Sequence, residues 1–453
     1  MKIGFVSLGC PKNQLDTEVM LHEIASAGHE ITPDETEADI VIINTCAFIE
    51  SAKKESIDNI LDIAWLKKHH TLKGLIVTGC MAERYGKEIL DEFPEVDAVL
   101  GVGSIHNIVE AVNSCIENAG KKKKKGQPDC RYYSHEDKET VRLGGDRILT
   151  TPDYAAYLKI SEGCDNRCTY CAIPDIRGHF RSRPMEDLVE EAKELDALGV
   201  KELTIIAQDT TRYGIDLYGK YCLDELLHKI TEQTQIPWIR VLYCYPDKIT
   251  DGLIEEMKNN PRILNYIDLP LQHISDRVLR KMNRHGGSQM IRNVLAKIKK
   301  EIPDIVIRTT FIVGFPGETR EDFEELAQFV KDQRFARAGV FTYSREEGTP
   351  AYDFADQIDE QIKQDRMDIL MRSQLQISDE ENNAKVGTVV NVLCEDYDPV
   401  SELYFGRSEA DAPEIDGKVF FKSEEKIPAG SFVKVKIRSV TDYDLCGFAM
   451  KDK

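Results

Sequence analysis

The sequence predicts an α/β protein with three parts: an N-terminal parallel α/β domain, a central partial (β/α)6 barrel and a small C-terminal all-β barrel. Short β-branched runs alternate with amphipathic stretches over 2–117 and again over about 154–350, which is typical of strands that alternate with helices. After about residue 384 the pattern changes to short strands separated by Gly and Pro turns. The length of 453 residues fits roughly three domains of about 150 residues each.

The N-terminal domain is expected at 1–117. Buried parallel strands are predicted in "KIGFVSL", "DIVIIN" and "GLIVTG", and helices are predicted near 14–27, 50–66 and 83–92. Residues 118–150, which include five consecutive lysines, lose this periodicity and are interpreted as a linker. Because no aromatic residues are interleaved with the lysines, a solvated linker is favoured over a nucleic-acid patch.

The central domain is expected at 151–383. Helical patterns such as "PMEDLVEEAKELDALG" separate its candidate strands, which are 155–160, 202–207, 238–244, 264–269, 305–313 and 338–343. Six strand–helix units make an open partial barrel, since a closed one takes eight. A helix at about 359–383 ends this domain, and the all-β barrel is expected at 384–453.

Composition restricts the partners and the compartment. The formal net charge of −20 disfavours binding to a phosphate backbone. No apolar run is long enough for a membrane span, and "MKIGFVSLGCPKNQ" is not a signal peptide. We therefore expect a cytoplasmic protein whose 12 cysteines stay reduced, which favours metal binding or catalysis over disulfides.

Three cysteines cluster in "SEGCDNRCTYCAIP": Cys164, Cys168 and Cys171. They follow the first strand of the predicted barrel, and βα barrels place their catalytic groups after the strands. Thiolates bind zinc or iron–sulfur clusters, and a closed site takes four ligands, so three leave one position open. The catalytic location favours an iron–sulfur cluster over a zinc site that borrows a distant His or Cys.

A second set of cysteines ends three predicted strands: Cys10, Cys46 and Cys80. Their spacings, 36 and 34 residues, correspond to one strand–helix unit each. In a parallel sheet all three emerge at the carboxyl edge, where such folds place their sites. This favours a second three-thiolate cluster over three unrelated buried cysteines. The other cysteines show no grouping and are expected to be structural: Cys115, Cys130, Cys222, Cys244, Cys394 and Cys446.

The C-x3-C-x2-C motif after the first strand of a six-unit barrel resembles the radical S-adenosylmethionine (SAM) enzymes. This resemblance implies that the three cysteines hold a [4Fe–4S] cluster whose open iron binds SAM. Tyr170 matches the aromatic position that packs near the adenine, with ordinary loop packing as the alternative. In "TTFIVGFPGET", Gly314 and Gly317 lie where backbone approaches the adenosine, although such a turn needs no ligand.

Polar residues follow two of the predicted barrel strands. Gln208 and Asp209 come after the second strand, and Gln272 and His273 come after the fourth. All are candidates for the catalytic rim. No catalytic base is assigned, because hydrogen-atom abstraction by a carbon radical needs none, and these groups are expected to position the substrate.

Two open clusters, SAM and this order of domains resemble the methylthiotransferases, which join a three-cysteine domain, a radical SAM barrel and a C-terminal barrel called TRAM. The resemblance implies two SAM molecules: one methylates a sulfur at the auxiliary cluster, and the other yields the 5′-deoxyadenosyl radical that activates a substrate carbon to capture the methylthio group. An electron donor such as flavodoxin or ferredoxin is implied as well.

Several strings resemble the RimO-like group, which modifies the β-carbon of an aspartate in small-subunit ribosomal protein S-twelve: "SLGCPKN", "SEGCDNRC", "QDTTRYGIDLYG", "LPLQHISDRVL" and "GRSEADAPEIDG". Residues 395–416 are also strongly acidic, with Arg407 their only basic residue. Such a surface attracts a basic ribosomal protein or the small subunit and repels nucleic acid. Docking is therefore expected at Glu409, Asp411, Glu414 and Asp416.

Three alternatives stay open. A generic solvated acidic loop explains the C-terminal segment taken alone. A tRNA adenosine methylthiotransferase predicts a basic C-terminal barrel, and only the strand with Lys434, Lys436 and Arg438 has that character, which leaves contact with ribosomal RNA open. A non-enzymatic iron–sulfur or zinc scaffold does not need two sets of three ligands.

Overall fold

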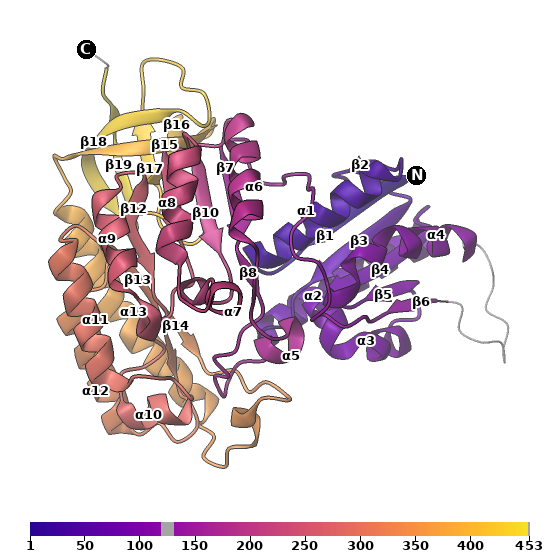
Figure 1. The fold of residues 1–453 in the computed structure, drawn as a ribbon, viewed down its shortest axis with the longest axis horizontal. Coiled ribbons are helices and arrows are strands. Elements are labelled where there is room, and N and C mark those ends of the chain that lie inside the picture. The colour runs from indigo at the N-terminus through magenta and orange to yellow at the C-terminus, as the bar shows by residue number, and fades with distance from the viewer. Residues whose placement is uncertain (119–130, 452–453) are drawn as a thin grey trace. The chain divides into compact units, whose positions relative to one another are not determined.

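The computed structural model describes residues 1–118 and 131–451, which form two compact units (Figure 1). The first unit consists of Met1–Thr150, Ser161–Arg183 and Ser344–Tyr352, and the second of Thr151–Ile160, Pro184–Tyr343 and Asp353–Lys453. The lysine run and Cys130 lie outside the described residues. No helix in the described ranges is both long enough and apolar enough to cross a membrane.

The first unit is built on a parallel sheet with the strand order β2-β1-β3-β4-β5-β6. Its strands are β1 (Lys2–Ser7), β2 (Glu30–Thr32), β3 (Ile40–Thr45), β4 (Gly74–Gly79), β5 (Ala98–Leu100) and β6 (Tyr132–Ser134). Its helices are α1 (Pro11–Ser26), α2 (Glu50–His69), α3 (Cys80–Glu92), the 3-10 helix η1 (Val102–Asn107) and α4 (Ile108–Asn118).

Both faces of this sheet are covered, as its continuous apolar strands require. Every residue of β3 and β4 is buried. Alternate residues of β3 point to opposite faces, so that Val41 and Ile43 pack with α2 and α3, while Ile40 and Ile42 pack with α1 and α4. Helices on both faces are the usual consequence of a parallel sheet.

The described part of the expected linker, 131–150, packs on the first unit instead of leaving it. β6 pairs in parallel with β5. Lys138 Nζ donates to Glu83 Oε1 at 2.8 Å, and the Thr150 amide donates to Glu18 Oε1 at 2.8 Å. An edge strand of three residues is too short to produce a visible periodicity, which explains why the sequence does not reveal it.

The second unit contains the central sheet. Its strand order is β14-β13-β12-β11-β10-β7, with all pairs parallel, which confirms the partial (β/α)6 barrel. The strands are β7 (Ala155–Lys159), β10 (Glu202–Ile206), β11 (Trp238–Val241), β12 (Ile263–Asp268), β13 (Val306–Val313) and β14 (Arg337–Thr342).

Helices and short turns connect these strands, and α13 follows the last of them. The α-helices are α6 (Met185–Ala197), α7 (Ile215–Tyr218), α8 (Leu223–Gln233), α9 (Asp251–Asn259), α10 (Asp276–Lys281), α11 (Gly287–Glu301), α12 (Arg320–Gln333) and α13 (Glu360–Asn383). The 3-10 helices between the strands are η2 (Thr210–Arg212) and η3 (Pro246–Lys248), whereas η4 (Pro350–Asp353) follows β14 and lies mostly in the first unit. α12 begins with a capping box between Thr319 and Asp322, which satisfies its first backbone N–H groups.

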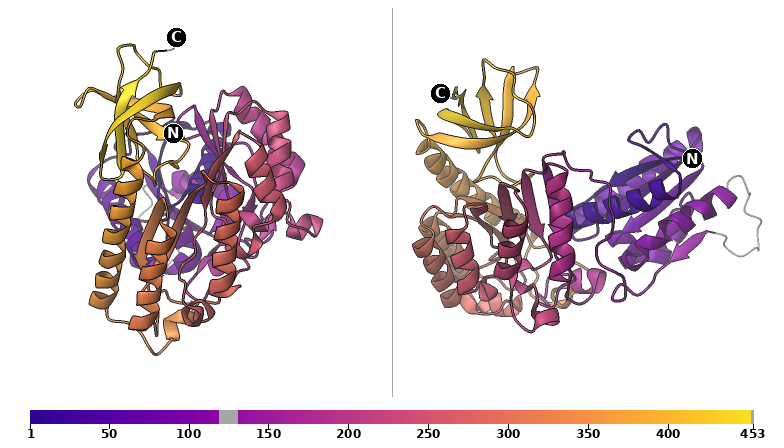
Figure 2. Two further views of the ribbon diagram at one scale, coloured as in Figure 1. Left: turned by 90° about the vertical axis from the view of Figure 1, so that its left-hand side faces the viewer. Right: turned by 45° about the horizontal axis from the view of Figure 1, so that its top comes forward.

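The C-terminal strands form the expected all-β barrel, closed in the order β15-β16-β17-β19-β18 (Figure 2). Its strands are β15 (Val389–Asp398), β16 (Leu403–Ser408), β17 (Val419–Lys422), β18 (Phe432–Thr441) and β19 (Asp444–Ala449). Inward residues such as Val392, Phe421 and Ile437 form its core. By its contacts this barrel belongs to the same unit as the central sheet.

Candidate functional site

The cysteines that end the N-terminal strands meet at one edge of the first sheet, as their spacing predicts. β1, β3 and β4 are neighbours in this sheet, and Cys10 precedes α1, Cys46 follows β3, and Cys80 opens α3. Thr45 and Gly79 are register partners, so Cys46 and Cys80 leave adjacent strands at the same level. The described structure therefore brings three thiols together from three separate strand–helix units.

The turn before Cys80 requires glycine. Gly79 has a φ of +92°, and a Cβ there would lie 2.5 Å from the backbone oxygen of Thr45. Side chains cannot occupy that space without moving the backbone of β3. Gly79 thus allows the ends of β3 and β4 to approach closely, and it sets the position at which Cys80 starts its helix.

Polar side chains hold the backbone around these thiols. Ser56 Oγ accepts a hydrogen bond from the Cys46 amide at 3.0 Å and donates to the Cys46 carbonyl at 2.8 Å. Asn13 Nδ2 donates to the Leu8 carbonyl at 2.7 Å, and Asn44 Nδ2 donates to the Asn13 carbonyl at 2.8 Å. This frame fixes the loops after β1 and β3, which carry two of the three thiols.

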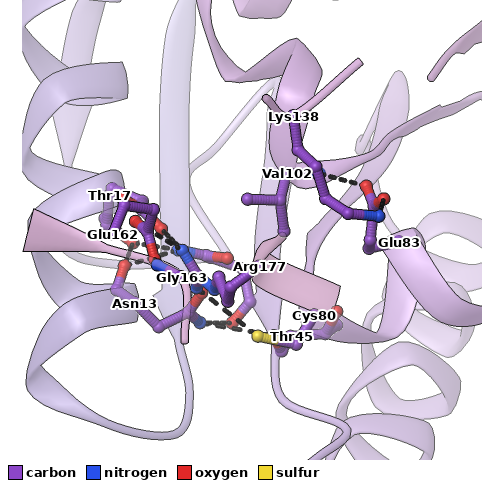
Figure 3. A network of polar contacts seen from close by, with 12 residues as sticks. Asn13, Thr17, Thr45, Cys80, Glu83, Val102, Lys138, Glu162, Gly163 and Arg177 are labelled. Carbon is purple, nitrogen blue, oxygen red and sulfur yellow. Dashed lines mark hydrogen bonds and ion pairs between the residues drawn. The ribbon is translucent and has the colours of Figure 1, made fainter. Parts of the chain in front are cut away.

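A buried arginine adjoins the third thiol. Arg177 is 2% exposed, and its Nη2 lies 3.4 Å from Cys80 Sγ and 3.0 Å from Asn13 Oδ1 (Figure 3). Its Nη1 donates to Asp16 Oδ2 at 2.5 Å and lies 3.4 Å from Glu162 Oε2. The sequence did not single out Arg177, since one arginine in "IPDIRGHF" has no spacing signature.

The three thiols ionise differently. Burial raises the pKa of Cys80 to about 12 against the opposing charge of Arg177, and burial also raises the pKa of Cys46. For Cys10 burial acts in the same direction, but Lys12, Arg177 and the first N–H groups of α1 outweigh it and lower its pKa. A thiol with a raised pKa becomes a thiolate ligand only beside additional positive charge, such as that of a metal.

The second set of cysteines lies on a loop of the same unit. The pair β8 (Ser161–Glu162) and β9 (Arg181–Ser182) closes this loop, and the short helix α5 (Ile173–Arg177) lies within it. The Cys164 amide donates to the Gly178 carbonyl at 3.1 Å, and the Cys171 amide donates to the Cys168 carbonyl at 3.0 Å. Tyr170 is half-buried in this loop.

The donor chemistry of both sets fits iron–sulfur clusters. Among the described residues, no three or more His, Cys, Asp or Glu side chains lie close enough together to hold a single metal ion. In a [4Fe–4S] cluster each thiolate binds a different iron, so the ligands are spaced more widely than those around one ion. Thiolate ligands select soft centres of this kind, so the donor atoms of both sets are compatible with iron–sulfur clusters.

Of the rim candidates in the second unit, two are fully buried. Asp209 is 1% exposed, accepts a hydrogen bond from Thr211 Oγ1 at 2.7 Å and pairs with Lys248 at 3.4 Å. His273 is 0% exposed, and its Nδ1 accepts the Ser275 amide hydrogen at 3.0 Å. Both residues follow the carboxyl ends of β10 and β12, as expected of rim candidates, and their neighbours hold their side chains inside the fold.

The other two rim candidates, Gln208 and Gln272, are half-buried. Gln272 has a φ of +69°, while its amide donates to the Thr310 carbonyl and its carbonyl accepts from the Ile312 amide, both at 2.8 Å. These bonds to β13 hold the residue in a conformation that an L-residue rarely adopts. Such backbone strain is concentrated at functional sites, so Gln272 stays a rim candidate.

The side chain of Glu318 holds the glycine turn after β13 in place. Glu318 Oε2 accepts the Gly314 and Phe315 amide hydrogens at 2.7 and 3.2 Å, and Oε1 pairs with Arg366 at 2.8 Å. Burial raises the pKa of Glu318 to about 7, although Arg366 and both amides act to lower it. Gly314 and Gly317 have φ of +72° and +76°, so this turn requires glycine whether or not adenosine binds there.

The acidic C-terminal segment is only partly exposed, which corrects the expected docking surface. Asp411 is 2% exposed and pairs with Arg337 at 2.5 Å. The Asp416 side chain is 3% exposed and accepts a hydrogen bond from Tyr266 at 2.6 Å. Both carboxylates are therefore engaged by the central sheet and cannot dock a partner.

Glu409 and Glu414, by contrast, are exposed. Asp and Glu are rarely buried unless they are paired, so an acidic run by itself predicts an exposed surface. The paired arginines of this unit lie on strands far away in the sequence, so no local pattern indicates which of the acids are internal.

Comparisons with known proteins agree with this architecture. Family models match the chain at three stretches: the uncharacterized protein family UPF0004 at 2–101, the radical SAM superfamily at 158–330 and the TRAM domain at 386–450. The ribosomal protein uS12 methylthiotransferase RimO of Desulforamulus reducens is 51% identical over 446 residues, which cover 98% of each chain. The RimO protein of Thermoanaerobacter sp. is 51% identical over 445 residues, which cover 98% of this chain and 99% of that protein.

The chain belongs to the RimO family of radical SAM methylthiotransferases. The resemblance predicted from the cysteine motifs is thereby confirmed. Membership in the RimO family makes the chain a radical SAM enzyme, and it implies the use of SAM and a [4Fe–4S] cluster.

Solved structures of more distant proteins share the fold. The radical SAM methyltransferase TsrM from Kitasatospora setae superposes with a TM-score of 0.54 at 14% identity, covering 85% of this chain and 78% of that chain. The cobalamin-dependent SAM radical enzyme OxsB superposes with a TM-score of 0.52 at 10% identity, covering 83% of this chain and 57% of that chain. At these identities the likeness concerns the fold alone.

Proposed function

We propose that this RimO-family chain adds a methylthio group to the β-carbon of an aspartate in ribosomal protein uS12 and uses two [4Fe–4S] clusters to do so. The substrate is the one named for the relatives that are 51% identical over nearly the whole chain. The proposal of two clusters is supported by one observation: two sets of three cysteines lie within the same compact unit. A ribosomal substrate also places the reaction in the cytoplasm.

In this proposal each cysteine set holds its own cluster. Cys164, Cys168 and Cys171 hold the SAM-binding cluster, and the set at the sheet edge, which consists of Cys10, Cys46 and Cys80, holds the auxiliary cluster. When bound, the clusters and SAM supply the radical and the sulfur chemistry. The protein excludes competing reactions by holding the thiols in buried or half-buried positions.

Other residues serve binding and orientation. Tyr170, Gly314 and Gly317 are proposed to contact the adenosine of SAM, and Gln208 and Gln272 to orient the substrate aspartate. Amides suit this task because they hydrogen-bond a carboxylate without transferring a proton. An electron donor such as flavodoxin or ferredoxin is proposed to reduce the SAM-binding cluster.

The exposed carboxylates Glu409 and Glu414 are proposed to attract the basic substrate protein. Their neighbours Asp411 and Asp416 contact Arg337 and Tyr266 on the central sheet, whereas the rim candidates follow the carboxyl ends of its strands. Arg337 is the first residue of β14, at the amino-terminal end. The acidic segment therefore suits long-range steering of the substrate and not its presentation to the radical.

The test uses full-length protein, reconstituted anaerobically and supplied with SAM and a strong reductant. A peptide copying the aspartate-bearing loop of uS12 and unmodified tRNA are offered side by side, and mass spectrometry records an added methylthio group. We expect the group on the peptide alone. Its appearance on tRNA alone would assign the chain to nucleic-acid modification.

The same assay separates the two clusters. Cys46→Ala is expected to abolish methylthio transfer but to retain formation of 5′-deoxyadenosine, whereas Cys168→Ala abolishes both. Each variant should bind about four iron atoms instead of about eight. Cys115→Ala is the matched control, because Cys115 is buried in α4 outside both sets and its loss should leave the iron content unchanged. Full iron binding by Cys46→Ala would refute the auxiliary cluster.

A further inference from the structure

Arg177 is the feature of the first unit that the chemistry described so far leaves without a role. Its guanidinium is buried and contacts three other elements: Asn13 and Asp16 on α1, Glu162 on β8 and Cys80 on α3. A buried guanidinium loses its hydration, so it is retained only where its neighbours compensate for that loss. Here two carboxylates, an amide oxygen and a sulfur do so.

The two ends of the guanidinium have different partners. Nη1 faces the carboxylates of Asp16 and Glu162, at 2.5 and 3.4 Å. Nη2 faces Asn13 Oδ1 and Cys80 Sγ, at 3.0 and 3.4 Å. Because the guanidinium is a rigid planar fork, the carboxylates that anchor Nη1 also fix the direction in which Nη2 presents its hydrogens. The positive charge is thus held against the sulfur.

The position of Arg177 in the chain links the two cysteine sets. α5 begins two residues after Cys171, and Arg177 is its last residue. Ala172 and Ile176 pack into the same apolar core as Cys80 and Met81 of α3. One short segment therefore extends from the last cysteine of the SAM-binding motif to a thiol of the auxiliary set.

We propose that Arg177 is a positioning residue that orients Cys80 as a cluster ligand and raises the reduction potential of the auxiliary cluster. This inference rests on the proposed function, in which Cys10, Cys46 and Cys80 hold that cluster. Reduction adds one electron to a cluster, and a fixed positive charge beside a ligand sulfur stabilises the more negative, reduced state. Hydrogen bonds to ligand sulfurs act in the same direction.

Asp16 provides a second test of the proposal, because its removal should shift the reduction potential in the direction opposite to the removal of Arg177. Its carboxylate lies 2.5 Å from Arg177 and partly neutralises the guanidinium as seen from the cluster. Removing the charge of Asp16 should therefore raise the potential, whereas removing that of Arg177 should lower it. A role confined to folding would not produce opposite shifts from two members of one ion pair.

The experiment isolates the auxiliary cluster in the full-length chain. Cys164, Cys168 and Cys171 are all replaced by Ala, the protein is reconstituted anaerobically, and the cluster is titrated with dithionite and redox mediators while electron paramagnetic resonance follows the reduced form. In this background Arg177→Met should lower the ratio of reduced to oxidised cluster at a fixed potential by about tenfold or more. Arg177→Lys, which keeps a charge, should shift it less, and Asp16→Asn should raise it.

Lys67→Met is the matched control. Lys67 is a largely buried cation of the same unit, but it pairs with Asp97 at the amino-terminal edge of the sheet, before β5. Its loss should leave the midpoint unchanged. Iron and sulfide contents are measured for every variant, so that a change in cluster occupancy is distinguished from a change in potential.

Each outcome decides a different point. If Arg177→Met and Asp16→Asn both keep the midpoint of the background protein, Arg177 is structural only and the inference is overturned. Should Arg177→Met not fold, the Asp16→Asn shift decides alone, because that variant retains the guanidinium. Absence of iron from the background protein itself would refute the auxiliary cluster, and the inference with it.

Discussion

Burial sets the charge state of His273 at the scale of the single residue. The ring is fully enclosed, its Nδ1 accepts the Ser275 amide hydrogen, and its Nε2 lies 3.8 Å from Glu318 Oε2. Burial lowers the pKa of His273 to about 3. The imidazole therefore stays neutral in the folded protein throughout the neutral range.

His273 should make folding stability depend on pH. In the unfolded chain it takes up a proton near pH 6.5, whereas in the folded chain it does so only near its lowered pKa, so acidification favours unfolding. Below pH 6.5 the wild type should lose about 1.4 kcal/mol per pH unit relative to His273→Asn, which has no titrating ring. Urea denaturation of both proteins at pH 7.5 and 5.5 measures this, and parallel losses in the two would contradict it.

At the scale of the element, the end of β4 shows how a strand–helix junction makes a site. Gly79 places Cys80 at the start of α3, next to the end of β3. This arrangement repeats the strand–thiol–helix order of the preceding units, which is why a regular cysteine spacing was sufficient to predict it. The fold supplies the shared edge, and the glycine supplies the close approach of the two strands.

Substitution of Gly79 should be much more harmful than substitution of a glycine with a similar backbone in open space. Gly79→Ala places a Cβ 2.5 Å from the Thr45 carbonyl oxygen, whereas Gly28→Ala, at φ +84°, meets nothing within 4 Å. We expect Gly28→Ala to cost about 1–2 kcal/mol from backbone strain alone. Gly79→Ala should lower the melting temperature further and lose iron. Equal melting temperatures for the two variants would show that the junction can relax.

Sequence patterns predicted the elements that are long enough to show a clear hydrophobic pattern. The strands of both sheets that precede the cysteines and the rim candidates were predicted within a few residues, because each is a mostly apolar run rich in β-branched or aromatic residues. β2, β5 and β6 were not, since three residues contain too little periodicity. Arg177 was missed for another reason: its contact with Cys80 joins residues 97 positions apart, and nothing in either local sequence encodes it.

At the scale of the whole molecule, buried ion pairs join the C-terminal barrel to the central sheet within the second unit. Arg407 on β16 pairs with Glu202 at 2.6 Å, and Glu202 also pairs with Arg240 at 2.7 Å. Arg337 pairs with Asp411. All these groups are almost completely buried. Each has lost its hydration, and the attraction of its partner compensates for that loss.

Removing one partner should therefore destabilise the unit strongly. Asp411→Ala leaves the buried Arg337 without its carboxylate and should cost about 3–5 kcal/mol. Glu414→Ala, in the same acidic run but exposed, should leave stability unchanged. Thermal unfolding measures the stability of both variants. If Asp411→Ala destabilises the protein only slightly, water reaches Arg337 and replaces the lost carboxylate.

The same buried pairs restrict how the C-terminal barrel can be exchanged between related enzymes. A graft cut near residue 384 would transfer Arg407 and Asp411 but leave Glu202, Arg240 and Arg337 behind on the central strands. A donor barrel with different charges at those two positions would bury unmatched ions at the junction. A working chimera therefore has to keep each of these pairs matched, either by choosing a donor barrel with the same charges or by moving the partner residues of the central strands with it.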